Sequence, residues 1–100
     1  MPRLIWTAPA VADLDRCYRF LAKDNVDAAR RAVAAVRSGA RILMDHPQIG
    51  RPALDWPGGY REWPIRFGAA GYVMLYRPVE DDVVILALCH MREAGFRRND

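Results

Sequence analysis

The sequence is poor in lysine, cysteine and long apolar runs, and each shortage limits the kinds of site or segment that the chain can contain. Lys23 is the single lysine among fifteen basic residues, so the cationic groups are almost all planar guanidinium forks suited to carboxylate and phosphate. Cys17 and Cys89 lack metal-site spacing and are predicted to be buried thiols in a reducing compartment. The longest apolar run, residues 83–89, is too short to cross a membrane. The opening residues lack the apolar core of a secretory signal, so we expect a cytoplasmic protein without a membrane partner.

Two further absences concern small ligands. No histidine or cysteine cluster with ligand spacing is present, and no glycine-rich phosphate loop follows a strand. We therefore expect no metal site and no cofactor. With 100 residues, 52% of them hydrophobic, the chain is predicted to form one globular domain over residues 1–100. The net charge of +3 suits an anionic partner, and nucleic acid and an acidic polypeptide both remain open.

The first half of the chain has the periodicity of a strand followed by two helices. Residues 3–7 are a short strand candidate, and Thr7 is placed to cap a helix that runs to about Lys23. A second helix is predicted over residues 26–45, capped by Asn25 or Asp27. The two should pack as an antiparallel hairpin because the loop between them is short. Their predicted inward stripes are Val11, Leu14, Tyr18 and Leu21 in the first helix, and Ala29, Val33, Val36, Ala40 and Leu43 in the second.

The second half is predicted to be a loop over residues 46–59 and then a three-stranded antiparallel meander. The strands are residues 60–67, 71–77 and 83–90, separated by turns at 68–71 and 78–82. Pro64 cannot donate to a ladder, so the first strand should lie at an edge or carry a bulge there. Residues 83–90 are apolar at both parities, which indicates an interior strand covered on both faces. The fold class is therefore α+β. The helices cover one face of the sheet, and the other must be closed by loops, the C-terminal segment or another chain.

Basic side chains gather in sequence on this meander and just after it. We expect them, with one aromatic residue, to line a concave surface that binds an anionic macromolecule. The predicted partner-binding residues are Arg61, Arg66, Arg77, His90, Arg92 and Phe96.

The order of these elements and several short motifs resemble the RelE/ParE superfamily of bacterial toxins. The motifs lie along nearly the whole chain: Trp6-Thr7, Ala10-x-x-Asp13-Leu14, Leu43 with Pro47, Gly50-Arg51, Tyr60-Arg61-Glu62, residues 71–77, Val84-Ile85-Leu86 and residues 90–96. The resemblance implies the toxin of a type II toxin–antitoxin module, held inactive by the C-terminal part of a cognate antitoxin in a hetero-oligomer. It also implies one of two targets, DNA gyrase in ParE-like members or messenger RNA on the ribosome in RelE-like members.

The residues themselves leave both activities open. A metal-independent endoribonuclease needs an acid or base and cations on the phosphate, and His90, Arg61, Arg77 and Arg92 are the candidate catalytic residues. Against this, the chain lacks the lysine pair of RelE-like members, and Phe96 stands where their terminal tyrosine would be. The interpretation that we favour is a non-enzymatic gyrase inhibitor, and the alternative is a ribosome-dependent endoribonuclease. His90 and the arginines also fit purely structural roles.

Overall fold

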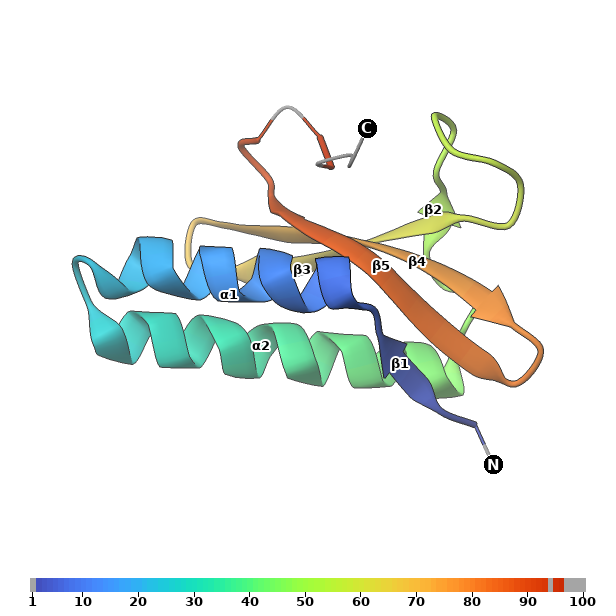
Figure 1. The fold of residues 1–100 in the computed structure, drawn as a ribbon, viewed down its shortest axis with the longest axis horizontal. Helices are drawn as coiled ribbons and strands as arrows, with labels where there is room; N and C mark the ends of the chain where they lie inside the picture. The colour runs from blue at the N-terminus through green and yellow to red at the C-terminus, as the bar shows by residue number, and fades with distance from the viewer. Residues whose placement is uncertain (1, 94, 97–100) are drawn as a thin grey trace.

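A pair of antiparallel helices lies against one face of a twisted sheet in the computed structural model, which describes residues 2–93 and 95–96 (Figure 1). The order along the chain is β1 (Leu4–Trp6), α1 (Ala8–Ala22), α2 (Val26–Asp45), β2 (Arg51–Pro52), β3 (Arg61–Phe67), β4 (Ala70–Val79) and β5 (Asp82–His90). The α+β prediction, with its N-terminal strand, helix hairpin and meander, is confirmed. Among the described residues, no helix is long and apolar enough to cross a membrane.

Helix α1 begins where the sequence predicts and is rotated from the predicted orientation. The Thr7 hydroxyl accepts a hydrogen bond from the backbone N–H of Ala10 and so caps the helix. The residues that α1 buries are Ala10, Asp13 and Cys17, while Val11 of the predicted stripe is 52% exposed. The prediction for Val11 is therefore wrong. Small side chains at positions 10 and 17 let the helix approach the sheet closely, and the Asp13 carboxylate finds a hydrogen-bond donor there.

Helix α2 agrees closely with its prediction. It runs from Val26 to Asp45, and the Asn25 side chain caps it by accepting from the N–H of Ala28. Its buried residues are Ala29, Ala32, Val36, Ala40 and Leu43. Gly39 lies against β3, where a Cβ atom would come within 2.8 Å of the Ile65 side chain. The indole N–H of Trp63 also donates to the Gly39 carbonyl, so this glycine permits the close contact of helix and sheet.

The strand order of the sheet is β1-β5-β4-β3-β2. Strand β1 pairs in parallel with β5, and the other neighbours pair antiparallel. Strand β5 is therefore interior, as predicted. Strand β2 pairs only with Arg61 and Glu62 of β3, so the part of β3 that holds Pro64 is a free edge, which agrees with the expectation for this proline.

A β-bulge in β5 decides which of its side chains face the helices. Leu75 pairs with Ala87 and Tyr76 pairs with Ile85, so Leu86 is the extra residue. Before the bulge Ile85 belongs to the helix-side core, and after it Leu88 does. The apolar residues of both parities in β5 thus reflect this bulge as well as an interior position.

The loop predicted over residues 46–59 is wrong in one respect, because it contains β2. The turns are also shorter than predicted. Strands β3 and β4 are separated by residues 68–69, and β4 and β5 by residues 80–81. Two positions in these turns, Gly68 and Glu80, have positive φ.

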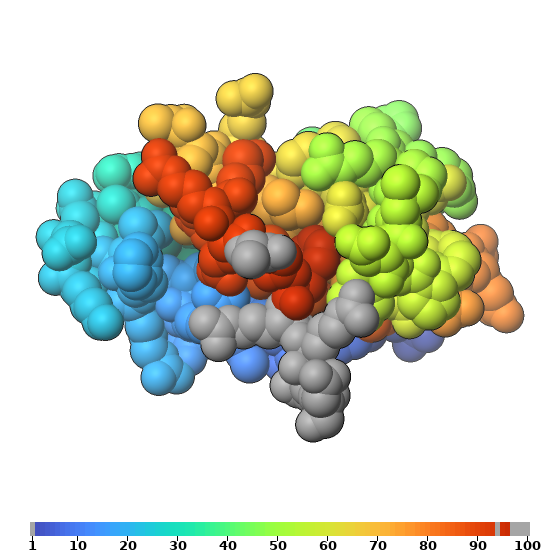
Figure 2. Space-filling view, turned by 90° about the horizontal axis from the view of Figure 1, so that it is seen from above, coloured from blue at the N-terminus to red at the C-terminus, as the bar shows by residue number. Residues whose placement is uncertain are grey.

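The face of the sheet away from the helices is closed by the loop before β3 and by the C-terminal segment. Leu75 and Ala87 form a small core there with Ala53, against which Trp56, Tyr60, Leu86 and Phe96 pack. Figure 2, which looks down on this side, shows the residues after β5 (red) beside the loop between β2 and β3 (yellow-green). Of the three predicted ways of closing this face, the structure therefore uses two, a loop and the C-terminal segment.

Candidate partner-binding groove

A groove of about 790 Å³ opens between the second half of α1 and the end of the sheet. Its apolar wall includes Phe20, whose side chain is 71% exposed although it is large and aromatic. Exposed apolar surface that polar groups border is typical of an interaction site. The residues that line the groove are Arg16, Cys17, Phe20, Leu21, Tyr72, His90, Arg92 and Glu93.

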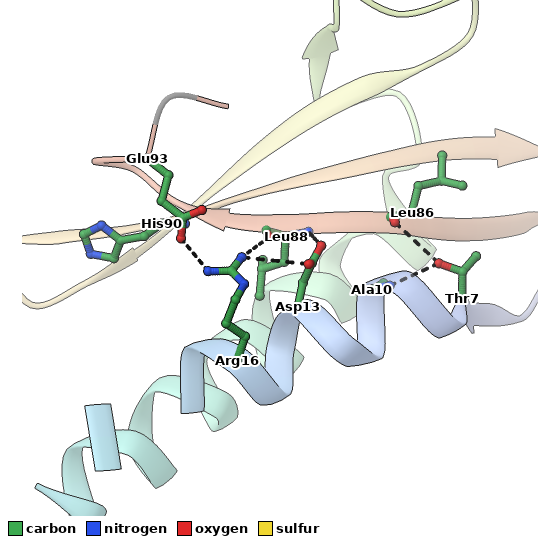
Figure 3. Close-up of polar contacts among 8 residues, drawn as sticks. All are labelled: Thr7, Ala10, Asp13, Arg16, Leu86, Leu88, His90 and Glu93. Atoms are coloured by element: carbon green, nitrogen blue, oxygen red, sulfur yellow. Dashed lines mark hydrogen bonds and ion pairs between the residues drawn. The ribbon is translucent and has the colours of Figure 1, made fainter. Parts of the chain in front are cut away.

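Arg16 joins α1 to the end of β5 (Figure 3). Its Nη1 donates to the Glu93 carboxylate at 2.8 Å, and its Nη2 donates to the Leu88 carbonyl at 3.4 Å. One turn earlier, Asp13 accepts the backbone N–H of Leu88 at 3.0 Å and lies 3.8 Å from Arg16. Despite the cost of burial, the hydrogen bond to Glu93 and the nearby carboxylates leave the pKa of Arg16 raised, so its guanidinium stays charged.

His90 and Arg92 lie on the other side of the groove from α1. The imidazole of His90 packs edge-on against Tyr72, with ring centres 5.4 Å apart. Its Nδ1 accepts the backbone N–H of Arg92 at 3.1 Å, which fixes the ring orientation and leaves Nε2 as its other polar atom. Burial raises the pKa of the Tyr72 hydroxyl, with Cys17 as a smaller cause, so this hydroxyl remains protonated near neutral pH.

Arg61 lies outside the groove, and its contacts hold the loop that precedes β2. Its Nη1 donates to the carbonyl of Gln48 at 3.2 Å and to that of Gly50 at 2.6 Å. The buried Tyr76 hydroxyl holds the same loop, since it donates to the Pro47 carbonyl and accepts from the N–H of Gly50. Because strand pairing sets Arg61 opposite Tyr76 and Tyr72 opposite His90, Arg61 and His90 are four residues apart along β4.

Arg77 and Phe96 belong to the opposite face of the sheet. The Arg77 guanidinium lies 5.6 Å from the centre of the Tyr60 ring, which stacks on Trp56 at 5.7 Å. Phe96 meets Trp56 edge-on at 6.4 Å. Arg66 also alternates onto this face and is exposed opposite Gly71.

The predicted residues are thus not gathered into one arginine-lined concavity. The structure brings His90 and Arg92 together in the groove. It places Arg77 and Phe96 on the other face, where Tyr60 and Trp56 lie between them. The groove residues from α1, Arg16 and Phe20, were missed by sequence reasoning. Phe20 carried a usable signal, because it is an aromatic residue outside the predicted apolar stripe of its helix.

Neither cysteine has the properties of a nucleophile. Burial and the nearby carboxylate of Glu93 raise the pKa of Cys89 from 9.0 to about 11, and Cys17 is also buried. Within the described part of the chain, no group of three or more histidine, cysteine, aspartate or glutamate residues is placed to hold a metal ion.

This chain thus combines a small sheet backed by one helix hairpin with an apolar and cationic groove at their junction. Residues 4–95 match the family described as ParE toxin of type II toxin-antitoxin system, parDE, and the chain belongs to this family. It is 37% identical over 81 residues to Toxin RelE3 of Caulobacter vibrioides, covering 81% of this chain and 85% of that one. It is 33% identical over 89 residues to Toxin ParE3 of the same organism, covering 88% and 85%.

A solved structure described as a chromosomal ParDE TA system from P. aeruginosa has the same fold. It superposes with a TM-score of 0.73 at 22% identity and covers 90% of this chain and 96% of that one. The protein is therefore the toxin of a type II toxin–antitoxin system, and a cognate antitoxin is its partner.

Proposed function

We propose that this toxin arrests growth by binding and inhibiting DNA gyrase, without a catalytic reaction of its own. The separation of the candidate catalytic side chains carries the proposal. Arg61 is engaged by two loop carbonyls, and Arg77 lies on the opposite face of the sheet from His90. Phosphodiester cleavage needs its cations and its proton-transfer group around one scissile phosphate.

The groove at the end of the sheet is the proposed docking site of the antitoxin. It offers apolar surface at Phe20, Leu21 and Tyr72, and positive charge at Arg16 and Arg92. An amphipathic segment with acidic side chains matches both properties. An antitoxin segment that orders on binding is able to cover such a surface although it pays an ordering cost.

A test of the target compares two reactions with the same purified toxin. Supercoiling of relaxed DNA by gyrase should be inhibited in proportion to toxin concentration, and translation in a cell-free extract should continue. Adding the antitoxin should restore supercoiling. Folded toxin that leaves supercoiling unchanged at a large excess over gyrase would refute the proposal.

A test of the docking site uses a matched pair of exposed apolar residues. Phe20→Ser should weaken antitoxin binding at least tenfold, since it removes a large side chain from the groove. Leu54→Ser is the control, because Leu54 is 92% exposed and outside the groove. Equal affinities of the two variants would show that the antitoxin binds elsewhere.

Ribosome-dependent RNA cleavage is the second candidate function, and one observation favours it. Within residues 2–93 and 95–96, Nε2 of His90 has no hydrogen-bond partner, and it lies in the groove with Arg92, where a ribose and a phosphate would meet an acid or base and a cation. His90→Ala, with its circular dichroism spectrum unchanged, distinguishes the two functions. Growth arrest by this variant should persist, whereas its loss together with that of RNA cleavage would establish the nuclease.

A further inference from the structure

Arg16 stands out because its hydrogen bonding is incomplete. Its Nε is buried and has no hydrogen-bond partner within the described structure, although both terminal nitrogens have one. A buried donor without an acceptor is costly, and such a group in a binding groove points to an acceptor supplied on binding. The guanidinium is held on the groove wall by the Glu93 carboxylate, which contacts Nη1.

Glu93 is the anchor of the residues that follow β5. The same oxygen that contacts Arg16 also accepts the backbone N–H of His90 at 3.4 Å. Glu93 and His90 line both the groove and a second cavity of about 330 Å³ on the opposite face of the sheet. The contact between Arg16 and Glu93 therefore lies between the groove on one face of the sheet and the second cavity on the other.

We propose that Arg16 is a switch residue: a carboxylate of the bound antitoxin takes the Arg16 guanidinium from Glu93. A carboxylate that arrives from the groove is able to bind Nε and one terminal nitrogen in parallel once the guanidinium turns outward, whereas the Glu93 carboxylate accepts from Nη1 and leaves Nε unsatisfied. The exchange satisfies the orphaned Nε and releases the anchor of the C-terminal segment. This inference rests on the groove being the antitoxin site, as proposed above.

Because the Glu93 carboxylate and the antitoxin carboxylate compete for Arg16, weakening the first should increase the affinity for the antitoxin. Removing the charge of Glu93 frees Arg16 in advance, so Glu93→Gln should tighten antitoxin binding by about three- to fivefold, the upper range for an ion pair whose two side chains are partly exposed. In an Arg16→Met background neither carboxylate has the Arg16 guanidinium to bind. There, Glu93 keeps its bond from the His90 N–H but no longer competes for a guanidinium, so Glu93→Gln should change the affinity by less than about 1.5-fold.

The experiment is a double-mutant cycle by calorimetric titration of the cognate antitoxin into wild-type toxin, Glu93→Gln, Arg16→Met and the double variant. Glu62→Gln is the matched control, because Glu62 pairs with Arg51 at a similar distance of 2.9 Å outside the groove, and it should leave affinity unchanged. The uncharged Arg16→Gln replaces Arg16→Met in the cycle if the latter unfolds. Arg16→Lys alone should also lower the affinity, since lysine cannot offer the bidentate fork.

Each outcome decides the question. Unchanged or weaker binding by Glu93→Gln, or the same tightening with and without Arg16, overturns the switch. Failure of Phe20→Ser to weaken binding instead overturns the docking site itself. Replacing the antitoxin's acidic residues one at a time by their amides should identify one carboxylate whose loss lowers the affinity for wild-type toxin. Its loss should not lower the affinity for Arg16→Met any further.

Discussion

Asp13 provides the sharpest test of how this fold is held together. It is buried in α1, and its carboxylate accepts the backbone N–H of Leu88, a residue with no exposed surface in β5. Asp13→Ala removes this acceptor and leaves a buried N–H unsatisfied, which costs about 2 kcal/mol. For a domain of 100 residues this corresponds to a melting temperature lower by about 10 °C.

Two related variants separate the hydrogen bond from the charge. Asp13→Asn keeps an oxygen acceptor toward Leu88 and should cost less than about 1 kcal/mol. Asp15→Ala removes an exposed carboxylate two residues away whose partner is Arg19 one turn later, and it should cost at most about 0.5 kcal/mol. Urea and thermal unfolding followed by circular dichroism give the three values. Equal destabilisation by Asp13→Ala and Asp15→Ala would refute the reasoning.

Three further predictions test other contacts. Tyr76→Phe should lower the unfolding free energy in urea by about 2 kcal/mol, because it leaves the Pro47 carbonyl and its neighbouring loop without their buried partner; a change near zero would contradict this. The hydrogen bond from Arg3 lowers the pKa of Asp82, so the stability that Asp82 contributes is present above its unfolded pKa of about 3.9 and is lost as pH falls through the lower folded value. The melting temperature should therefore fall less steeply in acid for Asp82→Asn than for the wild type, and parallel curves would refute the assignment. Because the pKa of Cys89 is about 11, its thiolate fraction at pH 8 is about a hundredfold below that of a thiol with pKa 9.0. Iodoacetamide should therefore modify Cys89 far more slowly in native than in urea-unfolded protein. Equal rates would contradict its burial.

The helices were predictable because their signals are local. Thr7 and Asn25 are polar caps directly before helical sequences, and both cap as expected. The rotation of α1 was not predictable from apolarity alone. A stripe that includes Val11 looks more hydrophobic than one with Ala10 and Asp13, yet the sheet requires small residues for close approach and an acceptor for the Leu88 N–H.

Strand β2 could not be found in the sequence for a different reason. It has only two residues, one of them Pro52, so it carries no periodicity. Its position depends on tertiary contacts, because Arg61 and Tyr76 hold the preceding turn from β3 and β4. Gly50 fits there only because it lacks a side chain, since a Cβ atom would come within 2.6 Å of the Tyr76 ring.

The candidate site depends most on the single extra residue in β5. Alternation along an unbroken strand would set His90 on the face opposite Ile85, since the two positions differ by an odd number. The bulge at Leu86 reverses this parity, so His90 faces α1 beside Tyr72 while Arg77 in the neighbouring strand stays on the far face. Nothing in the run from Val83 to Cys89 distinguishes a bulged strand from a regular one, because residues of both parities are apolar. The sequence therefore predicts which cationic residues lie on the sheet, and the bulge decides that His90 meets the groove and Arg77 does not.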